Sequence, residues 1–184
     1  LLLVMLLPVV ALSQKENSPF CSKRDGFGHR TVKSNSLSVA QIAQTEKYDV
    51  NYYKLDLNMT NTSTTLSGYS EMKATALVPI DTVLYELFST LSISSVSLNG
   101  VNVPFTRTNS AVKIGVNYPA GTVFTVRTIY SGTPPTAQTN PLGGSGMSNA
   151  TSPSWCNEVV CSFSEPFCAY EWWPCKQSLT DKAD

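Results

Sequence analysis

The sequence predicts an all-β protein built from antiparallel strands. About seven short segments between residues 48 and 130 are rich in Val, Thr, Tyr, Leu and Ile and are separated by turn residues. Within these segments apolar and polar residues alternate with a period of two, which indicates strands with one buried and one wet face. No segment shows a convincing long helical pattern. The expected architecture is therefore a β-sandwich or a strongly curved sheet.

The first expected strand, residues 48–59, shows this alternation with one interruption. Tyr53, Leu55 and Leu57 fall on one face, whereas the apolar residues nearer the start of the segment are out of phase with them. A bulge near Tyr52 and Tyr53 would reconcile the two halves, because it inserts one extra residue into a strand.

The second expected strand, residues 66–78, alternates without interruption. Four apolar side chains share its expected buried face: Met72, Ala74, Ala76 and Val78. Shorter strands are expected at residues 82–88, 92–99, 101–107, 111–116 and 122–130. Asn99-Gly100 is the strongest hairpin signal in the chain, and Pro104 indicates an edge position because it cannot donate a ladder hydrogen bond.

The residues before the first strand predict export. Residues 1–13 are interpreted as the remnant of a secretory signal peptide, since their apolar run is shorter than the roughly 20 residues that span a bilayer. Cleavage is expected before Gln14, and the missing initiator Met indicates that the sequence begins inside the signal peptide. Residues 14–47 are expected to be a polar tether with a possible short helix at 38–46, for which Ser38 is the N-cap.

The β-domain is expected to cover residues 48–184. Within it, the Gly-, Pro-, Ser- and Thr-rich residues 131–154 predict a long surface loop. Residues 155–163 then return to a strand-like pattern. The last residues have the composition of a turn that leads into another element, so the chain is interpreted as a fragment of a longer exported protein.

Charge and histidine content exclude several functions for these residues taken alone. The chain has 184 residues, with 13 Lys and Arg against 13 Asp and Glu, so it lacks the net positive charge of nucleic-acid binders. A catalytic zinc site normally uses two or three His ligands, and His29 is the only histidine. The chain alone is therefore poorly equipped to be an enzyme, which leaves a binding or structural module, or a part of a larger protein.

Five cysteines occur in the chain, four of them within residues 156–175. The spacing of Cys156 and Cys161 is not that of a zinc ribbon. Export permits disulfides, so these two residues are expected either to form a disulfide across a short hairpin or to be free thiols.

The segment at residues 164–184 carries the strongest functional signal. It groups four aromatic residues, among them Trp172 and Trp173, around Glu165 and Glu171. The two tryptophans could form a stacking platform for a sugar, or they could pack at a domain interface and in the core.

The same segment resembles the end of the N-terminal domain of zinc aminopeptidases of the aminopeptidase N family. Residues 48–59 and 66–78 are similar to the start of that domain, and residues 83–105 and 123–135 are similar to its middle. The Trp-Trp-Pro-Cys-Lys form resembles secreted bacterial members most. The resemblance implies a saddle-shaped β-domain packed on a thermolysin-like catalytic domain. It also implies that the zinc ligands lie in that next domain and that none lies here.

The resemblance further implies one substrate-binding position. In the family, an acid or amide in a Q-x-[EQ] element reaches the active site and binds the free α-amino group of the substrate, and Glu165 matches it. Phe163 stands where the family often has Gln, so it becomes a candidate to line the first side-chain pocket. A carboxylate in a water-poor cleft is a simple partner for an ammonium group.

Two functions follow as hypotheses. In the first, the chain is the exported N-terminal part of a zinc metallo-aminopeptidase that removes N-terminal residues from peptides. Its partners are then the peptide N-terminus and its own downstream catalytic domain, with no nucleic acid and no transmembrane segment. The intact enzyme would be periplasmic, cell-surface or secreted, and this fragment alone would be inactive. In the second, the chain is a non-catalytic secreted β-sandwich that binds carbohydrate or mediates adhesion through Trp172 and Trp173.

Overall fold

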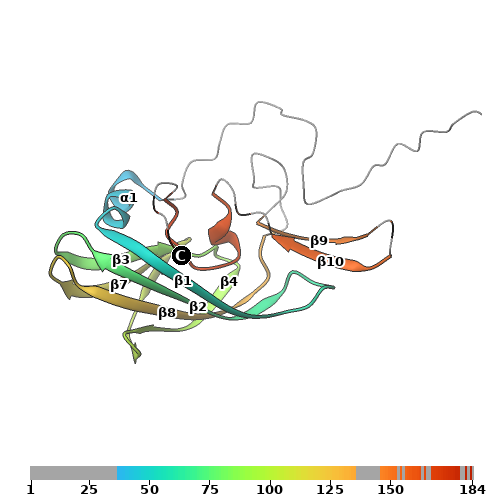
Figure 1. Cartoon of the computed structure of the whole chain (residues 1–184), viewed down its shortest axis with the longest axis horizontal. Coiled ribbons are helices and arrows are strands. Elements are labelled where there is room, and N and C mark those ends of the chain that lie inside the picture. The colour runs from blue at the N-terminus through green and yellow to red at the C-terminus, as the bar shows by residue number, and fades with distance from the viewer. Residues whose placement is uncertain are drawn as a thin grey trace, which may run out of the picture.

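The computed structural model describes residues 37–135, 146–152, 154, 156–162, 164, 167–178, 181 and 183. In these residues ten strands form three antiparallel sheets, with one short α-helix and one 3-10 turn (Figure 1). The predicted all-β, antiparallel architecture is confirmed. The expected signal remnant lies outside the described residues, as does the tether up to residue 36.

The largest sheet has five strands. Their order across the sheet is β1 (Tyr48–Met59), β2 (Leu66–Ala76), β8 (Val123–Gly132), β4 (Leu91–Leu98) and β5 (Val101–Asn102). The pairing of β1 with β2 shifts register between Val50 and Tyr52, so the predicted bulge is present and begins slightly earlier than expected. Gly68 has φ +150°, and a Cβ there would lie 2.0 Å from the backbone oxygen of Asp56. The close approach of β1 and β2 therefore requires glycine at this position.

The second sheet has three strands, in the order β3 (Ile80–Glu86), β7 (Ala111–Tyr118) and β6 (Thr106–Thr108). The expected single strand at residues 101–107 is divided around Pro104: β5 pairs with β4 in the large sheet, and β6 pairs with β7. Both pieces are edge strands, as the proline indicated. The hairpin before them turns at Asn99 and Gly100, whose φ angles of 50° and 84° are those of a type I′ turn.

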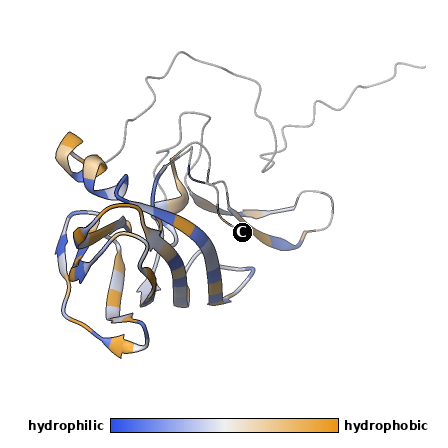
Figure 2. Cartoon of the chain, turned by 60° about the vertical axis from the view of Figure 1, so that its left-hand side comes forward, coloured by the Kyte–Doolittle hydropathy of each residue, from blue (hydrophilic) through white to orange (hydrophobic). Residues whose placement is uncertain are grey.

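The inward faces of these two sheets form the core. Figure 2 shows hydrophilic and hydrophobic residues alternating along the strands. The largest buried side chains are aromatic: Tyr48, Tyr85, Phe124 and Tyr130. Their hydroxyl groups find partners, since Tyr48 donates to the backbone oxygen of Leu84 at 2.6 Å and Tyr85 bonds to Thr128 at 2.8 Å. The prediction for β2 is wrong at one position: the strand ends at Ala76, and Val78 is 45% exposed.

The third sheet is a hairpin of β9 (Met147–Thr151) and β10 (Glu158–Ser162). The strand expected at residues 155–163 is confirmed, but the loop expected over 131–154 is wrong where β9 forms. Four of the five residues of β9 are exposed or only partly buried, which agrees with the polar sequence of this strand. Side-chain amides join this hairpin to the turn after β1: Asn149 donates to the backbone oxygen of Asn61 at 3.0 Å, and Asn61 donates to that of Glu158 at 3.2 Å.

The predicted short helix is confirmed as α1 (Val39–Thr45). Ser38 forms a capping box with Gln41, in which each side chain bonds to the backbone N–H of the other residue. The helix packs against β3, where Ile42 contacts the small cluster of Leu37, Leu84 and Ala111. No helix in the described ranges is long and apolar enough to cross a membrane.

The cysteines differ from the expected hairpin disulfide. Cys156 is an exposed thiol, whereas Cys161 is disulfide-bonded. The predicted disulfide between Cys156 and Cys161 is therefore wrong. The thiols of Cys168 and Cys175 are buried.

Candidate functional site

The closing segment, residues 167–178, follows the β9–β10 hairpin in the chain and lies against the five-stranded and the three-stranded sheet (Figure 1). It contains the 3-10 turn η1 (Ala169–Glu171). Glu86 at the end of β3 and Cys175 form an isolated antiparallel bridge: the N–H of Glu86 donates to Cys175 O at 2.9 Å and the N–H of Cys175 donates to Glu86 O at 3.0 Å. The N–H of Phe88 donates to Tyr170 O at 2.8 Å. These bonds fix the backbone of the closing segment against the three-stranded sheet.

Side chains of the five-stranded sheet hold the same segment from the other side. Ser70 on β2 donates to the backbone oxygen of Pro174 at 3.3 Å, and Tyr130 on β8 donates to that of Trp172 at 3.2 Å. The closing segment is thus bonded to both sheets, and its position follows from the core packing rather than from local propensity.

The aromatic residues of the closing segment pack edge to face. The rings of Tyr53 and Trp173 are 4.7 Å apart at 88°, and those of Trp172 and Trp173 are 6.1 Å apart at 62°. Both tryptophans are partly buried against the main core. A sugar-stacking platform needs an exposed, accessible ring face, and crossed ring planes packed on a core do not supply a shared one. The packing interpretation of the two tryptophans is therefore favoured.

The two predicted site residues, Glu165 and Phe163, lie outside the described residues, but both flanks of Glu165 are described. Ser164 directly precedes it, and its backbone oxygen accepts from the N–H of Cys168 at 2.9 Å. The indole N–H of Trp172 donates to Ser164 Oγ at 3.1 Å. On the far side, Gln177 Nε2 donates to the backbone oxygen of Phe167 at 2.8 Å. The closing segment thus fixes the chain immediately before and after residues 165 and 166.

Glu171 is a buried carboxylate whose structural role the sequence did not reveal. Its Oε2 accepts the backbone N–H of Gly146 at 2.6 Å. A Cβ on Gly146 would lie 2.6 Å from Cys168 O and 2.9 Å from the Glu171 side chain. Glycine therefore lets the backbone approach this carboxylate closely, which ties the start of β9 to the closing segment.

Burial and the nearby carboxylates disfavour further negative charge in this region. Burial, together with the charges of Glu171 and Glu86, raises the pKa of Tyr170 to about 12. Burial and the charge of Glu86 also raise the pKa of the Cys175 thiol well above its usual value. The thiolate is the nucleophilic form of cysteine, so Cys175 is suited to a structural role rather than to nucleophilic catalysis.

An ion pair fastens the end of the closing segment to β1. Lys176 Nζ lies 2.5 Å from Asp181 Oδ2 and donates to the backbone oxygen of Tyr48 at 2.7 Å. Asp181 in turn accepts the backbone N–H of Val50 at 3.4 Å. A hydrogen bond with Asp181, followed by burial and the negative charge of Asp181, raises the pKa of Asp49. Lys176 and Asp181 thus provide hydrogen-bond partners for the backbone C=O of Tyr48 and the backbone N–H of Val50 on β1, which is an edge strand.

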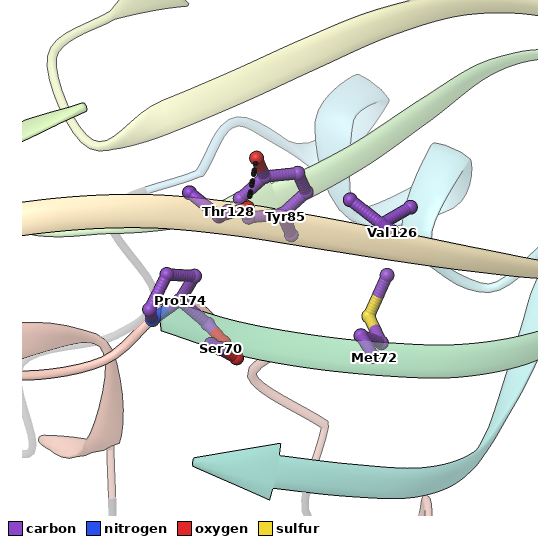
Figure 3. Close-up of a pocket in the computed structure, with 6 residues that line it drawn as sticks. All are labelled: Ser70, Met72, Tyr85, Val126, Thr128 and Pro174. Atoms are coloured by element: carbon purple, nitrogen blue, oxygen red, sulfur yellow. Dashed lines mark hydrogen bonds between the residues drawn. The ribbon is translucent and has the colours of Figure 1, made fainter. Parts of the chain in front are cut away.

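A cavity of about 10 Å³ lies where Pro174 meets the core, between β2, β3 and β8 (Figure 3). Its lining residues are Ser70, Met72, Tyr85, Val126, Thr128 and Pro174. This volume is at the lower limit for a single water molecule, which needs roughly 10–15 Å³. The cavity is too small for a peptide side chain and is not a substrate pocket.

The described residues do not fit a zinc centre. Among them there is no group of three His, Cys, Asp or Glu side chains that could hold a metal ion, and His29 lies outside them. A catalytic zinc needs three protein ligands. A zinc-dependent activity of the whole protein would therefore need ligands from elsewhere.

Comparison with known proteins shows the fold. No family model and no curated protein matches the sequence. The structure is similar to that of an M1 zinc metallopeptidase from Deinococcus radiodurans bound to a Tyr-Ser-Ala substrate, with a TM-score of 0.59, 23% identity and coverage of 74% of this chain and 31% of that chain. It is also similar to leukotriene A4 hydrolase from Saccharomyces cerevisiae, with a TM-score of 0.58, 15% identity and coverage of 75% and 22%.

This chain therefore has a β fold found in M1 zinc metallopeptidases and spans less than a third of the length of these neighbours.

Proposed function

We propose that this chain is the N-terminal β-domain of an exported zinc metallo-aminopeptidase related to aminopeptidase N. The observation that carries the proposal is the shared fold over 74% of the chain with a metallopeptidase whose structure holds a peptide substrate. The resemblance of residues 48–184 to that family's N-terminal domain, in which the similar segments occur in the same order, supports the proposal independently. This resemblance comes from residue patterns rather than from the fold.

In this proposal the domain recognises the free α-ammonium group of the peptide through Glu165. A charge-assisted hydrogen bond of this kind contributes about 1.5–3 kcal/mol. It also sets the register of the substrate, because the amine then lies at a fixed distance from the first peptide bond. Phe163 lines the pocket for the first side chain.

Zinc, held by ligands in a catalytic domain beyond these residues, would activate the water that hydrolyses the peptide bond. This chain contributes binding, orientation and one wall of the cleft. Separated from the catalytic domain, it should be inactive.

The test is a kinetic comparison of the full-length protein with its Glu165→Ala variant, using leucine p-nitroanilide. Loss of the ammonium contact should raise KM about tenfold to a hundredfold, with a smaller effect on kcat. Glu46→Ala is the matched control, because Glu46 is an exposed glutamate at the end of α1. Unchanged kinetics in Glu165→Ala would show that this residue does not recognise the amine.

A further inference from the structure

The outer face of the five-stranded sheet carries a pocket that has no part in the function proposed above. It is open, has a volume of about 630 Å³, and lies over β1, β2 and β8, which are neighbours in the sheet (Figure 1). Pockets that bind small molecules have volumes of roughly 300–1,000 Å³. Five of its seven lining residues are polar, and the other two are Tyr52 and Val123. We propose that this pocket binds a neutral oligosaccharide.

The bulge in β1 places two consecutive residues at this pocket. In a regular strand, neighbouring side chains point to opposite faces of the sheet. The register shift between Val50 and Tyr52 interrupts that alternation. Buried Val50 is therefore followed by Asn51 and Tyr52, both of which line the pocket. The bulge thus presents an amide and an aromatic ring side by side on the outer face.

Tyr52 and Val123 supply the apolar surface of the pocket from opposite sides. Tyr52 on β1 is 41% exposed, and Val123 on β8 is 54% exposed. Strand β2 lies between them, so the two outer strands are about 10 Å apart. A sugar ring has C–H groups on its faces and hydroxyl groups around its rim. Its faces pack on exposed aromatic and aliphatic side chains, while the rim needs polar partners.

Asn51 is one such polar partner, and it is held in place. Its Oδ1 accepts from Thr75 Oγ1 at 2.8 Å, and its Nδ2 donates to Asp49 Oδ2 at 3.1 Å. A carboxamide has two N–H donors and an oxygen with two lone pairs. Among the described contacts, each end of the Asn51 amide therefore keeps one further bonding position. A sugar hydroxyl can use both, because it donates and accepts.

The charges on this face balance, which favours a neutral ligand. In the strand register, Glu71 on β2 lies between Lys54 on β1 and Arg127 on β8, and Lys73 lies opposite Tyr52. The charged residues of this face on the three strands are three cations and three acids: Lys54, Lys73, Arg127, Asp49, Asp56 and Glu71. An anionic or cationic ligand therefore gains no net attraction here.

The experiment measures binding of cellohexaose, laminarihexaose and chitohexaose to the full-length protein by isothermal titration calorimetry. At least one of them should bind with a Kd of about 0.1–1 mM. The anionic hexagalacturonate should bind at least about tenfold more weakly than that sugar. This test does not depend on the function proposed above, because it measures sugar binding and not hydrolysis.

Two variants test the position of the site. Tyr52→Ala should weaken binding of that sugar at least about tenfold, whereas Tyr52→Phe should stay within about threefold because the ring remains. Asn51→Ala keeps the ring and should weaken binding about three- to tenfold. It gives independent information if Tyr52→Ala fails to fold.

Tyr69→Ala is the matched control. Tyr69 is on β2, two residues before Glu71, and so shares its face, but it does not line the pocket. The guanidinium of Arg127 lies 3.6 Å from the centre of its ring. This variant should change the Kd by less than about twofold.

Three results would overturn the inference. The first is the absence of binding by all three neutral hexasaccharides at concentrations up to about 5 mM. The second is an equal loss of affinity in Tyr52→Ala and Tyr69→Ala, which would place the binding elsewhere. The third is equal or tighter binding of hexagalacturonate, which would contradict the argument from charge balance.

Discussion

Replacement of Lys176 by methionine tests whether the ion pair holds the closing segment on β1. The side chains of Lys176 and Asp181 are only 5% and 8% exposed, so water cannot take over the lost interactions fully. Methionine keeps much of the aliphatic stem but removes the hydrogen bond to Tyr48 O and the partner charge of Asp181. Removing one partner of a fully buried pair costs about 3–5 kcal/mol.

The expected loss for Lys176→Met is smaller, about 2–3 kcal/mol in the free energy of unfolding, because the Asp181 carboxylate still accepts the backbone N–H of Val50 when the lysine is gone. Urea unfolding of the protein at pH 7, followed by circular dichroism, measures it. Lys176→Met/Asp181→Asn should lose less than the sum of the two single variants, since the double variant leaves no unpaired charge.

A loss below about 0.5 kcal/mol for Lys176→Met would refute the reasoning, because the pair would then behave as an ordinary surface ion pair. Additive single losses would also refute it, since they would show that the two side chains do not interact.

Two further predictions concern titrating groups. The pKa of Asp49 is raised in the folded protein, so the stability that Asp49 contributes is present below its unfolded pKa and is lost as the pH rises through the raised pKa. The Asp49→Asn substitution should abolish this part of the pH dependence of the free energy of unfolding in urea. An unchanged pH profile in this variant would contradict the assignment. The Cys175 thiol should resist alkylation by iodoacetamide at pH 8 in the native protein because burial raises its pKa, whereas the exposed thiol of Cys156 should be alkylated. Mass spectrometry measures the labelling of both residues. Rapid labelling of Cys175 in the native protein would show that its environment is open.

Strand positions could be predicted from the sequence because alternation directly reports a half-buried strand. The bounds of β1 were predicted to the residue, and the bulge was visible as a break in the phase of its apolar residues. Asn99-Gly100 predicted its turn because a type I′ turn requires positive φ at both positions. The capping serine of α1 was equally visible, because its role depends on residues three positions apart.

The errors have physical causes as well. Alternation cannot show that a proline divides one apolar run between two sheets, as Pro104 separates β5 from β6. Val78 fits the alternation of β2, but the strand has already ended at Ala76, and an apolar residue beyond a strand can remain exposed. Strand β9 has no apolar alternation to reveal it, because most of its residues are not buried.

The anchors of the candidate site were invisible to sequence reasoning because they join distant residues. Val50 and Asp181 are 131 positions apart, and Tyr53 and Lys176 are 123 apart. Nothing in either local sequence specifies such a partner. The aromatic and acidic composition of residues 164–184 marked the segment as important, but only the fold shows that Trp172 and Gln177 fix the flanks of Glu165.

The most direct measurement for the central claim compares initial rates of the full-length protein on leucine p-nitroanilide and on its N-acetylated form. The account predicts hydrolysis of the free amine and a rate lower by at least about tenfold on the acetylated substrate, because acetylation removes the charge that Glu165 is proposed to bind. Equal hydrolysis of both substrates, or no hydrolysis of either by the zinc-loaded protein, would contradict it.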